Sequence, residues 1–542
     1  MPLLKSVTQL LWLATITGGV AVRSSSDTEA DTPMVDLGYA VYRGTRLPAG
    51  VDQFLGIRYA KPPLGDLRFR SPRQPEPATG VQDASQFGPL CVGTGQPLGA
   101  GYDEDCLYVN VFKPSNATSD SKLPVWVYIQ GGGYAAMGNP NYNGTEVVSY
   151  SGGNIVQINF NYRVGVLGFL ASEEVRKDGN LNVGLLDQRF LLSWVKEHVS
   201  EFGGDPDHIV ISGTSAGGGS VSHHLTAYGG KDQHRHFIGA VLESPFWPTL
   251  RTVEDMEWQY SRLLNMTNCS SLSCLREMSA SALQAQSYGT VFPGTQPTDP
   301  FPLFYWLPVI DGDFIPDQLY SLFEEGRFAD VPILLGHTTN EGSWFANNAS
   351  SAAEVSAFLR SNYPHLTNPE LDIINQFYPK MDPLPEHNAY FPSSSAAYGD
   401  ATFTCPSSLM ARSVAQFWDP ERVWGYWFNV IDAGNTAAGV GVFHTFEVQA
   451  VFGPGQTGWT VGSLYNVNAP IVPITMGYWV SFVRNLNPNS YKADGAPIWE
   501  PWGSGKGHQI RLQTNNTAMV DITDSQVEKC WLWQSLAPIM EI

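Results

Sequence analysis

The sequence is short of positive charge. Its 31 Lys and Arg residues stand against 51 Asp and Glu residues, which gives a formal net charge of −20, and no cluster of Lys or Arg occurs. Such a chain would repel the phosphate backbone of a nucleic acid and the surface of an anionic membrane. We therefore expect no nucleic-acid partner.

Long apolar runs, linkers and repeats are also missing. Beyond the N-terminus no run reaches the roughly 18 apolar residues that a membrane helix requires, so we expect no membrane span. No Pro- or Ser-rich linker and no internal repeat divides the 542 residues. We expect residues 22–542 to form a single α/β domain.

The first 21 residues have the composition of a secretory signal peptide. Lys5 precedes an apolar run at 10–14, and residues 19–21 have the small-x-small pattern of a cleavage site. A buried N-terminal helix is the alternative, but the polar segment 24–32 that follows is typical of a new, solvated terminus. We expect residues 1–21 to be removed and the protein to be secreted.

The cysteines contain no CxxC motif, and none lies beside a histidine suited to bind metal, which argues against a cytosolic metal site. Six cysteines in a secreted chain indicate three disulfides. Spacing gives two local pairs and leaves one distant pair: Cys91 with Cys106, Cys269 with Cys274, and Cys405 with Cys530. Six sequons in polar stretches indicate glycosylation at several sites: Asn116, Asn143, Asn265, Asn268, Asn348 and Asn515.

Short apolar strands alternate with helical patterns along the chain, which predicts a large, mostly parallel central sheet with helices on both faces. The alternating segment 35–47 predicts a small N-terminal antiparallel sheet, and the prolines within 54–69 exclude a helix there. The strand patterns lie at 104–111, 123–130, 154–159, 208–212 and 238–242, and the clearest helical pattern at 185–202.

The strand pattern at 208–212 runs into Gly-Thr-Ser-Ala-Gly at 213–217, with Ser215 at the centre. In a sharp strand-to-helix turn the serine backbone is strained, and a Cβ at either flanking glycine would clash. The N–H groups and the positive dipole end of the following helix then point to where an oxyanion would develop. A plain glycine-rich turn is the alternative; the preceding strand and the partners below favour a nucleophile elbow.

Three glycines at 131–133 directly follow the strand at 123–130. They let the backbone approach a ligand and turn N–H groups into a cleft, as an oxyanion hole for an acyl intermediate requires. A flexible loop would have the same sequence. The position of the glycines, one strand end before the elbow, favours the catalytic interpretation.

A nucleophilic serine needs a carboxylate and a base, which in α/β-hydrolases follow it in the order acid, then histidine. Glu341 follows the strand pattern at 331–336 and is the leading acid. His444 follows the strand pattern at 423–428 after a long loop and is the best base. Other histidines beyond Ser215 lie too close to the elbow, before or against the acid, or in a Gly/Ser loop typical of solvent: His223, His224, His234, His236, His337, His365, His387 and His508.

Taken together, these segments resemble the type-B carboxylesterase/lipase family, which includes the cholinesterases and is common among secreted fungal esterases. The resemblance runs from about residue 35 to 535 and implies an α/β-hydrolase fold and a carboxylic ester hydrolase. It rests on the segments 54–69, 104–107, 131–134, 161–165, 187–189, 202–206, 213–217, 340–342 and 441–453.

The same resemblance implies roles for single residues. Ser215 matches the nucleophile, Glu341 the acid and His444 the base, the three residues already chosen from spacing. Gly132, Gly133 and Ala216 match the N–H donors of the oxyanion hole, and Ser244 matches a serine that hydrogen-bonds the acid. No metal or organic cofactor is called for, because side chains and water complete the reaction.

Two positions of this sequence depart from the pattern of the family. The elbow usually carries Glu where this chain has Thr214, which removes a buried carboxylate beside the nucleophile, and Pro245 stands where Gly is common. We expect the triad to survive both changes. A catalytically silent binding protein of the neuroligin type, which keeps the fold and lacks the triad, is the alternative function.

The sequence of the loop closed by Cys91 and Cys106 helps to distinguish an esterase from a true triacylglycerol lipase. In lipases of the family the corresponding loop is long and carries an apolar lid, and in cholinesterases it carries a tryptophan that binds choline. Here residues 92–105 contain many glycines, few apolar side chains and no Trp. We expect an esterase for soluble esters without preference for choline esters.

The natural ester is left open. Five aromatic residues lie near the motifs: Tyr134, Phe246, Trp247, Trp344 and Phe345. They either line a pocket for aromatic or secondary-metabolite esters or belong to the core, since 12% of the chain is aromatic.

Overall fold

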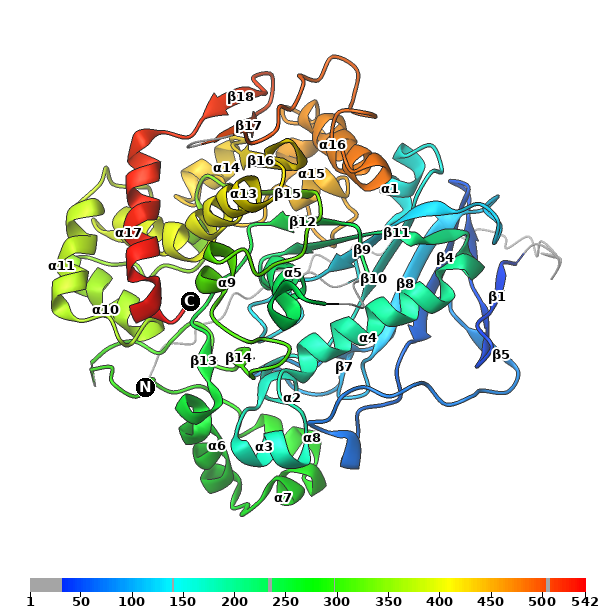
Figure 1. Cartoon of the computed structure of the whole chain (residues 1–542), viewed down its shortest axis with the longest axis horizontal. Helices are drawn as coiled ribbons and strands as arrows, with labels where there is room; N and C mark the ends of the chain where they lie inside the picture. The colour runs from blue at the N-terminus through cyan, green and yellow to red at the C-terminus, as the bar shows by residue number, and fades with distance from the viewer. Residues whose placement is uncertain (1–31, 139–140, 233–235, 297, 504–506) are drawn as a thin grey trace, which may run out of the picture.

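The computed structural model describes residues 32–138, 141–232, 236–296, 298–503 and 507–542. The predicted signal peptide at 1–21 lies outside the described residues. In the described ranges one large sheet is built from β3 (Thr45–Leu47), β4 (Val51–Arg58), β8 (Tyr108–Pro114), β9 (Leu123–Ile129), β10 (Val156–Phe160), β11 (Gly204–Thr214), β12 (Gly239–Glu243), β15 (Ile333–Thr338), β16 (Val423–Phe428), β17 (His508–Leu512) and β18 (Ala518–Asp521) (Figure 1).

The centre of this sheet is parallel. Strands β10, β9, β11, β12, β15, β16 and β17 lie side by side in that order, and each pairs parallel with its neighbour. The edges are antiparallel, through β18 on one side and β8, β4 and β3 on the other. The mostly parallel sheet is confirmed. Because parallel strands end at the same edge, the loops after β9, β11, β15 and β16 lie along one rim.

Helices cover both faces, also as predicted. Alternate residues of β9 enter two separate cores, Val125 and Val127 one and Trp126 and Tyr128 the other. The first core is closed by α4 (Val183–His198), α5 (Ala216–Thr226) and α13 (Cys405–Phe417), and the second by α1 (Thr145–Tyr150), α15 (Val448–Val451) and α16 (Ile471–Asn485). The helix predicted at 185–202 is α4 followed by a 3-10 turn at Val199–Phe202.

The N-terminal sheet is small but not wholly antiparallel. Strands β1 (Met34–Asp36) and β2 (Val41–Arg43) form the predicted antiparallel hairpin, whereas β5 (Val81–Asp83) pairs parallel with β2. Strand β3 leaves this sheet and pairs with β4 at the edge of the large one. Alternation predicts a strand but does not name its partner. Residues 54–69, all described, contain the end of β4 and a 3-10 turn at Gly65–Leu67 but no α-helix, as the prolines predict.

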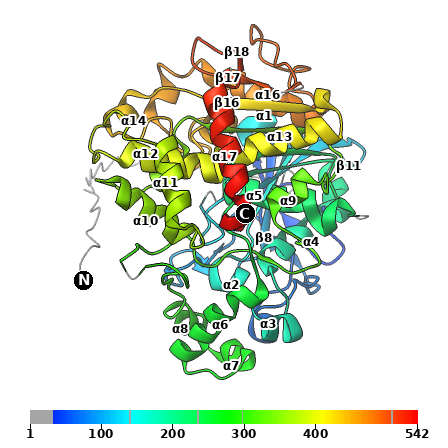
Figure 2. The same cartoon turned by 60° about the vertical axis from the view of Figure 1, so that its left-hand side comes forward.

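Three disulfides join the cysteines in the expected pairs: Cys91–Cys106, Cys269–Cys274 and Cys405–Cys530. The third ties the start of α13 to α17 (Asp524–Met540), which crosses close to α13 in both views (Figures 1 and 2). The other α-helices are α2 (Gly165–Phe169), α3 (Glu173–Asp178), α6 (Val253–Thr267), α7 (Leu272–Glu277), α8 (Ala280–Gln284), α9 (Leu319–Glu324), α10 (Ala352–Asn362), α11 (Asn368–Phe377), α12 (Phe391–Gly399) and α14 (Ala433–Ala437). None of the helices in the described ranges is long and apolar enough to cross a membrane.

Candidate active site

Ser215 lies at the turn between β11 and α5. It has φ 59° and ψ −123°, a conformation that strains any residue other than glycine. Its neighbours have no room for a side chain: a Cβ on Gly213 would lie 2.3 Å from the carbonyl of Gly217, and a Cβ on Gly217 would lie 2.0 Å from Ile129 O. The segment therefore has the sharp strand-to-helix geometry of a nucleophile elbow.

The backbone around Ser215 is fixed by the strand beside it. Its N–H donates to Glu243 O (2.9 Å), and its carbonyl accepts from Phe246 N (3.0 Å). Pro245, where the family commonly has Gly, packs against α5, because a Cβ on Gly218 would lie 2.9 Å from Pro245 Cα. The nucleophile candidate is thus held by the segment that also contains Ser244.

Glu341 and His444 meet although 103 residues separate them. Glu341 begins a 3-10 turn, Glu341–Trp344, after β15, and His444 lies in the loop between α14 and α15. His444 Nδ1 is hydrogen-bonded to Glu341 Oε2. The two loops are also joined directly, since Asn340 N donates to Val442 O (2.9 Å) and Val442 N donates to Asn340 Oδ1 (2.9 Å). The residues predicted as acid and base are therefore direct partners.

The surroundings of Glu341 favour its charged form. Oε1 accepts from Thr338 N (2.6 Å) and from Ser244 Oγ (2.7 Å), the contact that the resemblance implies for Ser244. Burial by itself raises the pKa of a carboxyl group. Here the charge of His444 and the hydrogen bonds to the carboxylate outweigh burial and hold the pKa of Glu341 below its ordinary value. Glu341 is therefore a carboxylate at neutral pH.

The other ring nitrogen of His444, Nε2, is buried and has no hydrogen-bond partner within the described part of the chain. The ring packs against Phe403 (centroids 4.3 Å apart) and Phe345 (5.1 Å), which stack on each other. Ser215 Oγ and His444 Nε2 are thus not hydrogen-bonded in this structure. Catalytic hydrogen bonds are often long without substrate and tighten in its complex. A free imidazole nitrogen opposite a carboxylate is placed to accept a proton.

The glycine loop after β9 has the geometry that its sequence suggests. Gly132 (φ 115°) and Gly133 (φ 64°) adopt left-handed conformations. A Cβ on Gly132 would lie 2.0 Å from Ala136 O, and one on Gly133 would lie 1.9 Å from the ring of Phe304. Ala216, the third candidate donor, begins α5, and the first N–H groups of a helix have no partner inside it.

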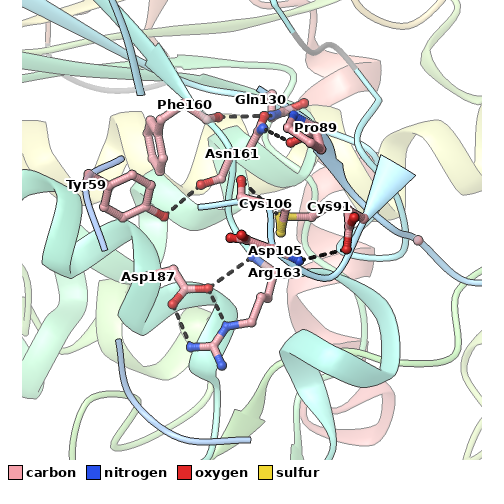
Figure 3. The surroundings of a disulfide bond; sticks show 12 residues. Tyr59, Pro89, Cys91, Asp105, Cys106, Gln130, Phe160, Asn161, Arg163 and Asp187 are labelled. Carbon is pink, nitrogen blue, oxygen red and sulfur yellow. Dashed lines mark hydrogen bonds and ion pairs between the residues drawn. A yellow bond between two sulfur atoms is a disulfide. The ribbon is translucent and has the colours of Figure 1, made fainter. Parts of the chain in front are cut away.

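A buried polar layer supports this loop (Figure 3). Asn161 joins three segments, because its side-chain N–H donates to Pro89 O (2.9 Å), its Oδ1 accepts from Gln130 Nε2 (3.3 Å) and its carbonyl accepts from Tyr59 OH (2.7 Å). Gln130 directly precedes the glycines. The segment 161–165 thus helps to fix the end of β9 and the start of the disulfide loop.

The disulfide loop itself contains no helix: residues 92–105 are all described, and none is helical. Its ends pair as β6 (Leu90–Cys91) and β7 (Tyr102–Asp103). The loop is held down by Gln284 Nε2, which donates to Gly93 O (2.6 Å). The loop therefore has no helical lid, in agreement with its glycine-rich sequence.

Two buried carboxyl groups near the site were not identified from the sequence. Glu243, the last residue of β12, accepts from Thr214 Oγ1 (2.8 Å) and from Trp479 Nε1 (2.7 Å). Burial raises its pKa to about 7, against the two hydrogen bonds, which lower it. With Thr214 in place of the usual Glu, we expected no carboxyl group beside the elbow. The carboxyl group of Glu243, at the end of β12, occupies this neighbourhood instead. The available signal was an acidic residue at the end of the apolar strand pattern at 238–242.

Glu447, three residues after His444, is the second missed carboxyl group. Its Oε1 accepts from Tyr426 OH (2.8 Å) and lies 3.2 Å from Ser244 Oγ, while Oε2 has no partner among the described residues. Burial, together with the charges of Glu341 and Glu243, raises the pKa of Glu447 well above its ordinary value. The surroundings of Glu447 therefore favour its neutral form.

The aromatic residues near the motifs divide into core and site. Tyr134 and Trp247 are fully buried, and Trp247 stacks on Phe323 in the core. Trp344 is 47% exposed and stacks on Phe443, the residue before His444. A group of phenylalanines connects Gly133 with His444, and it comprises Phe246, Phe304, Phe345 and Phe403.

One histidine differs from its predicted place. His508 does not lie in a solvent loop: it begins β17, and its Nε2 is 2.6 Å from Pro501 O. The Gly/Ser composition before it hid the start of the strand. His223 and His224 lie on α5 as expected, where burial lowers the pKa of both. The correction leaves His444 as the histidine bonded to the predicted acid.

Comparisons with known proteins lead to one family. A sequence profile of the carboxylesterase family matches residues 31–531. The chain belongs to the carboxylesterase family. The crystal structure of Aspergillus niger EstA is 54% identical to this carboxylesterase, covers 95% of this chain and 100% of its own, and superposes with a TM-score of 0.93. This match confirms the predicted α/β-hydrolase fold.

Two related proteins support this family assignment. Lipase 2 of Geotrichum candidum is 31% identical over 513 residues, which cover 82% of this carboxylesterase and 85% of that protein. Secreted lipase 4 of Gibberella zeae is 31% identical over 523 residues, which cover 90% and 89%. The family and these relatives make the chain a carboxylic ester hydrolase.

Proposed function

We propose that this carboxylesterase is a secreted serine esterase that works through an acyl-enzyme. Ser215 is the nucleophile, His444 the base and Glu341 the acid that orients the base. The observation that carries the proposal is the His444–Glu341 hydrogen bond, with Nε2 of the same ring unpartnered. A strained serine at the start of α5 is the second part that a nucleophilic hydrolase needs.

The reaction follows from these roles. Ser215 Oγ attacks the ester carbonyl carbon while its proton moves to His444 Nε2, and Glu341 stabilises the imidazolium. The N–H groups of Gly132, Gly133 and Ala216 bind the oxyanion. The bond to the alcohol oxygen then breaks, and His444 returns the proton to that oxygen. Water repeats the attack on the acyl-Ser215 ester, which releases the carboxylic acid and restores the serine hydroxyl.

The side chains on the proposed acyl side are aromatic and apolar. The ring of Phe304 contacts the place where a Gly133 side chain would stand, and Phe246 packs 4.8 Å from that ring. Phe403 and Phe345 close the side next to His444. This arrangement supports esters with an apolar acyl group, because four aromatic rings surround the space beside His444.

A soluble rather than an aggregated substrate is supported by the disulfide loop 92–105, which has no helix to serve as a lid. Relatives named lipases make triacylglycerol lipase the alternative. The test is the rate on tributyrin through its solubility limit, beside acetylthiocholine and a neutral acetate. We expect no rise in rate when tributyrin droplets form and no preference for acetylthiocholine over the neutral acetate. A sharp rise in rate would favour the lipase, and a strong preference for acetylthiocholine would favour a choline esterase.

Secretion is supported by the sequence of residues 1–21 and by relatives named secreted lipases. We propose residues 22–542 as one catalytic domain. Glycosylation is proposed at the exposed sequon asparagines, which are Asn116, Asn265, Asn268, Asn348 and Asn515, whereas Asn143 is half-buried and accepts from Thr145 N (2.9 Å).

The experiment that tests the proposal compares wild type with Ser215→Ala and His444→Ala. We expect each variant to lose about 10⁴-fold or more in kcat, because members of a triad act as one unit. Circular dichroism checks that the fold is intact. A variant with a tenth of wild-type activity contradicts the assignment and favours another site; wild type without esterase activity favours the neuroligin-like alternative.

A further inference from the structure

Glu243 is fully buried in the described structure, and the reaction proposed above does not use it. It stands between the nucleophile and the acid–base pair. Its carbonyl accepts the N–H of Ser215 (2.9 Å), and the next residue, Ser244, donates to Glu341 (2.7 Å). Glu243 is thus joined to Ser215 through its backbone carbonyl and to Glu341 through the next residue, Ser244.

The contacts of the Glu243 carboxyl group are those of an anion. The indole N–H of Trp479 on α16 can only donate, so Oε1 accepts in every charge state. Thr214 Oγ1 accepts from Tyr128 OH (3.1 Å) and donates its own proton to Oε2 (2.8 Å). A Glu243 protonated on Oε2 and donating to Thr214 would turn the Thr214 hydroxyl proton away from Oε2. Its protonation state is therefore coupled to the residue that precedes the nucleophile.

We propose that Glu243 is an ionisable positioning residue: its carboxylate fixes Thr214 before the nucleophile and adds a negative charge that favours the imidazolium formed at His444. This inference rests on the proposed triad. A fixed negative charge in a site closed to water stabilises a cation that develops during the reaction. The carboxyl group touches neither substrate nor reacting atoms and acts through its neighbours.

The groups that face Glu243 decide when it is charged. The ionisable side chains near it are Tyr128 of β9, Tyr426 of β16 and Glu447, next to α15. Burial raises the pKa of both tyrosines and of Glu447, which favours the neutral form of all three. With its own pKa raised to about 7, Glu243 is neutral in acid and ionised in mild alkali. The proposed charge is thus present only above about pH 7.

The test compares kcat/KM of wild type with that of Glu243→Gln across pH. Glutamine resembles the protonated acid, so we expect a wild-type to variant ratio near one at about pH 5.5 that rises to about five- to tenfold above pH 8. A ratio that is constant with pH overturns the inference.

A second variant separates charge from packing. Glu243→Asp keeps an ionisable group on a shorter side chain, so we expect it to exceed Glu243→Gln in kcat/KM above pH 8 and to fall below it in acid. If Asp is the poorer variant at every pH, the role is only structural and the proposal is wrong. Labelling of Ser215 by a fluorophosphonate counts the active sites: no labelling in wild type refutes the triad itself, whereas normal labelling with a flat ratio refutes Glu243 alone.

Discussion

Ser244 Oγ lies between two buried carboxyl groups whose surroundings act in opposite directions. Glu341, 2.7 Å away, bonds to His444 and to a backbone N–H, and its pKa is lowered. Glu447 is 3.2 Å away, and its Oε2 has no hydrogen-bond partner among the described residues. Burial and the negative charges of Glu341 and Glu243 raise its pKa. Burial alone does not set the charge of a carboxyl group; its hydrogen-bond donors and the charged groups around it also decide.

The hydroxyl of Ser244 has one proton, so it can donate to only one of the two carboxyl groups. The shorter contact assigns that proton to Glu341, so the contact with Glu447 is a hydrogen bond only if Glu447 donates. A neutral Glu447 can accept from Tyr426 and donate to Ser244 through the same hydroxyl oxygen. The proposed catalytic centre thus has a carboxyl group with a lowered pKa and one with a raised pKa on either side of one serine.

The largest effect is expected for Glu341→Gln. An amide cannot stabilise the imidazolium of His444, so we expect kcat to fall by about 10³- to 10⁴-fold. The melting temperature at neutral pH should fall too, because a carboxyl group with a lowered pKa stabilises the fold above its ordinary pKa and loses this contribution in acid. Steady-state kinetics and thermal melts check both. A variant within tenfold of wild type removes Glu341 from the triad.

Glu447→Gln is the matched control, and we expect a smaller change in kcat and the opposite pH dependence of stability. Its amide keeps a donor toward Ser244, so kcat should change by less than about threefold. The raised pKa means that Glu447 contributes stability in acid that wild type loses as pH rises above the ordinary value of 4.5. The melting temperature of the variant relative to wild type should therefore increase with pH. A decrease, or a hundredfold loss of kcat, would mean that Glu447 works as an anion.

The contrast between these acids also marks what sequence could predict. The parallel sheet, the elbow and the chain order of Ser215, Glu341 and His444 follow from local patterns, because strand periodicity and glycine geometry are local. Glu243 and Glu447 were missed, since their roles depend on Trp479 and Tyr426, which are distant in sequence. The parallel pairing of β5 with β2 was missed for the same reason: a strand pattern carries no information about its partner.

The central claim is that His444, oriented by Glu341, activates Ser215. The most direct measurement is fluorophosphonate labelling followed by peptide mapping of the modified residue, run on wild type, Glu447→Gln and Glu341→Gln. The account predicts a single adduct on Ser215, formed at a similar rate in wild type and Glu447→Gln and about 10³-fold more slowly in Glu341→Gln. An adduct on another residue, or equal labelling rates in all three proteins, would contradict it.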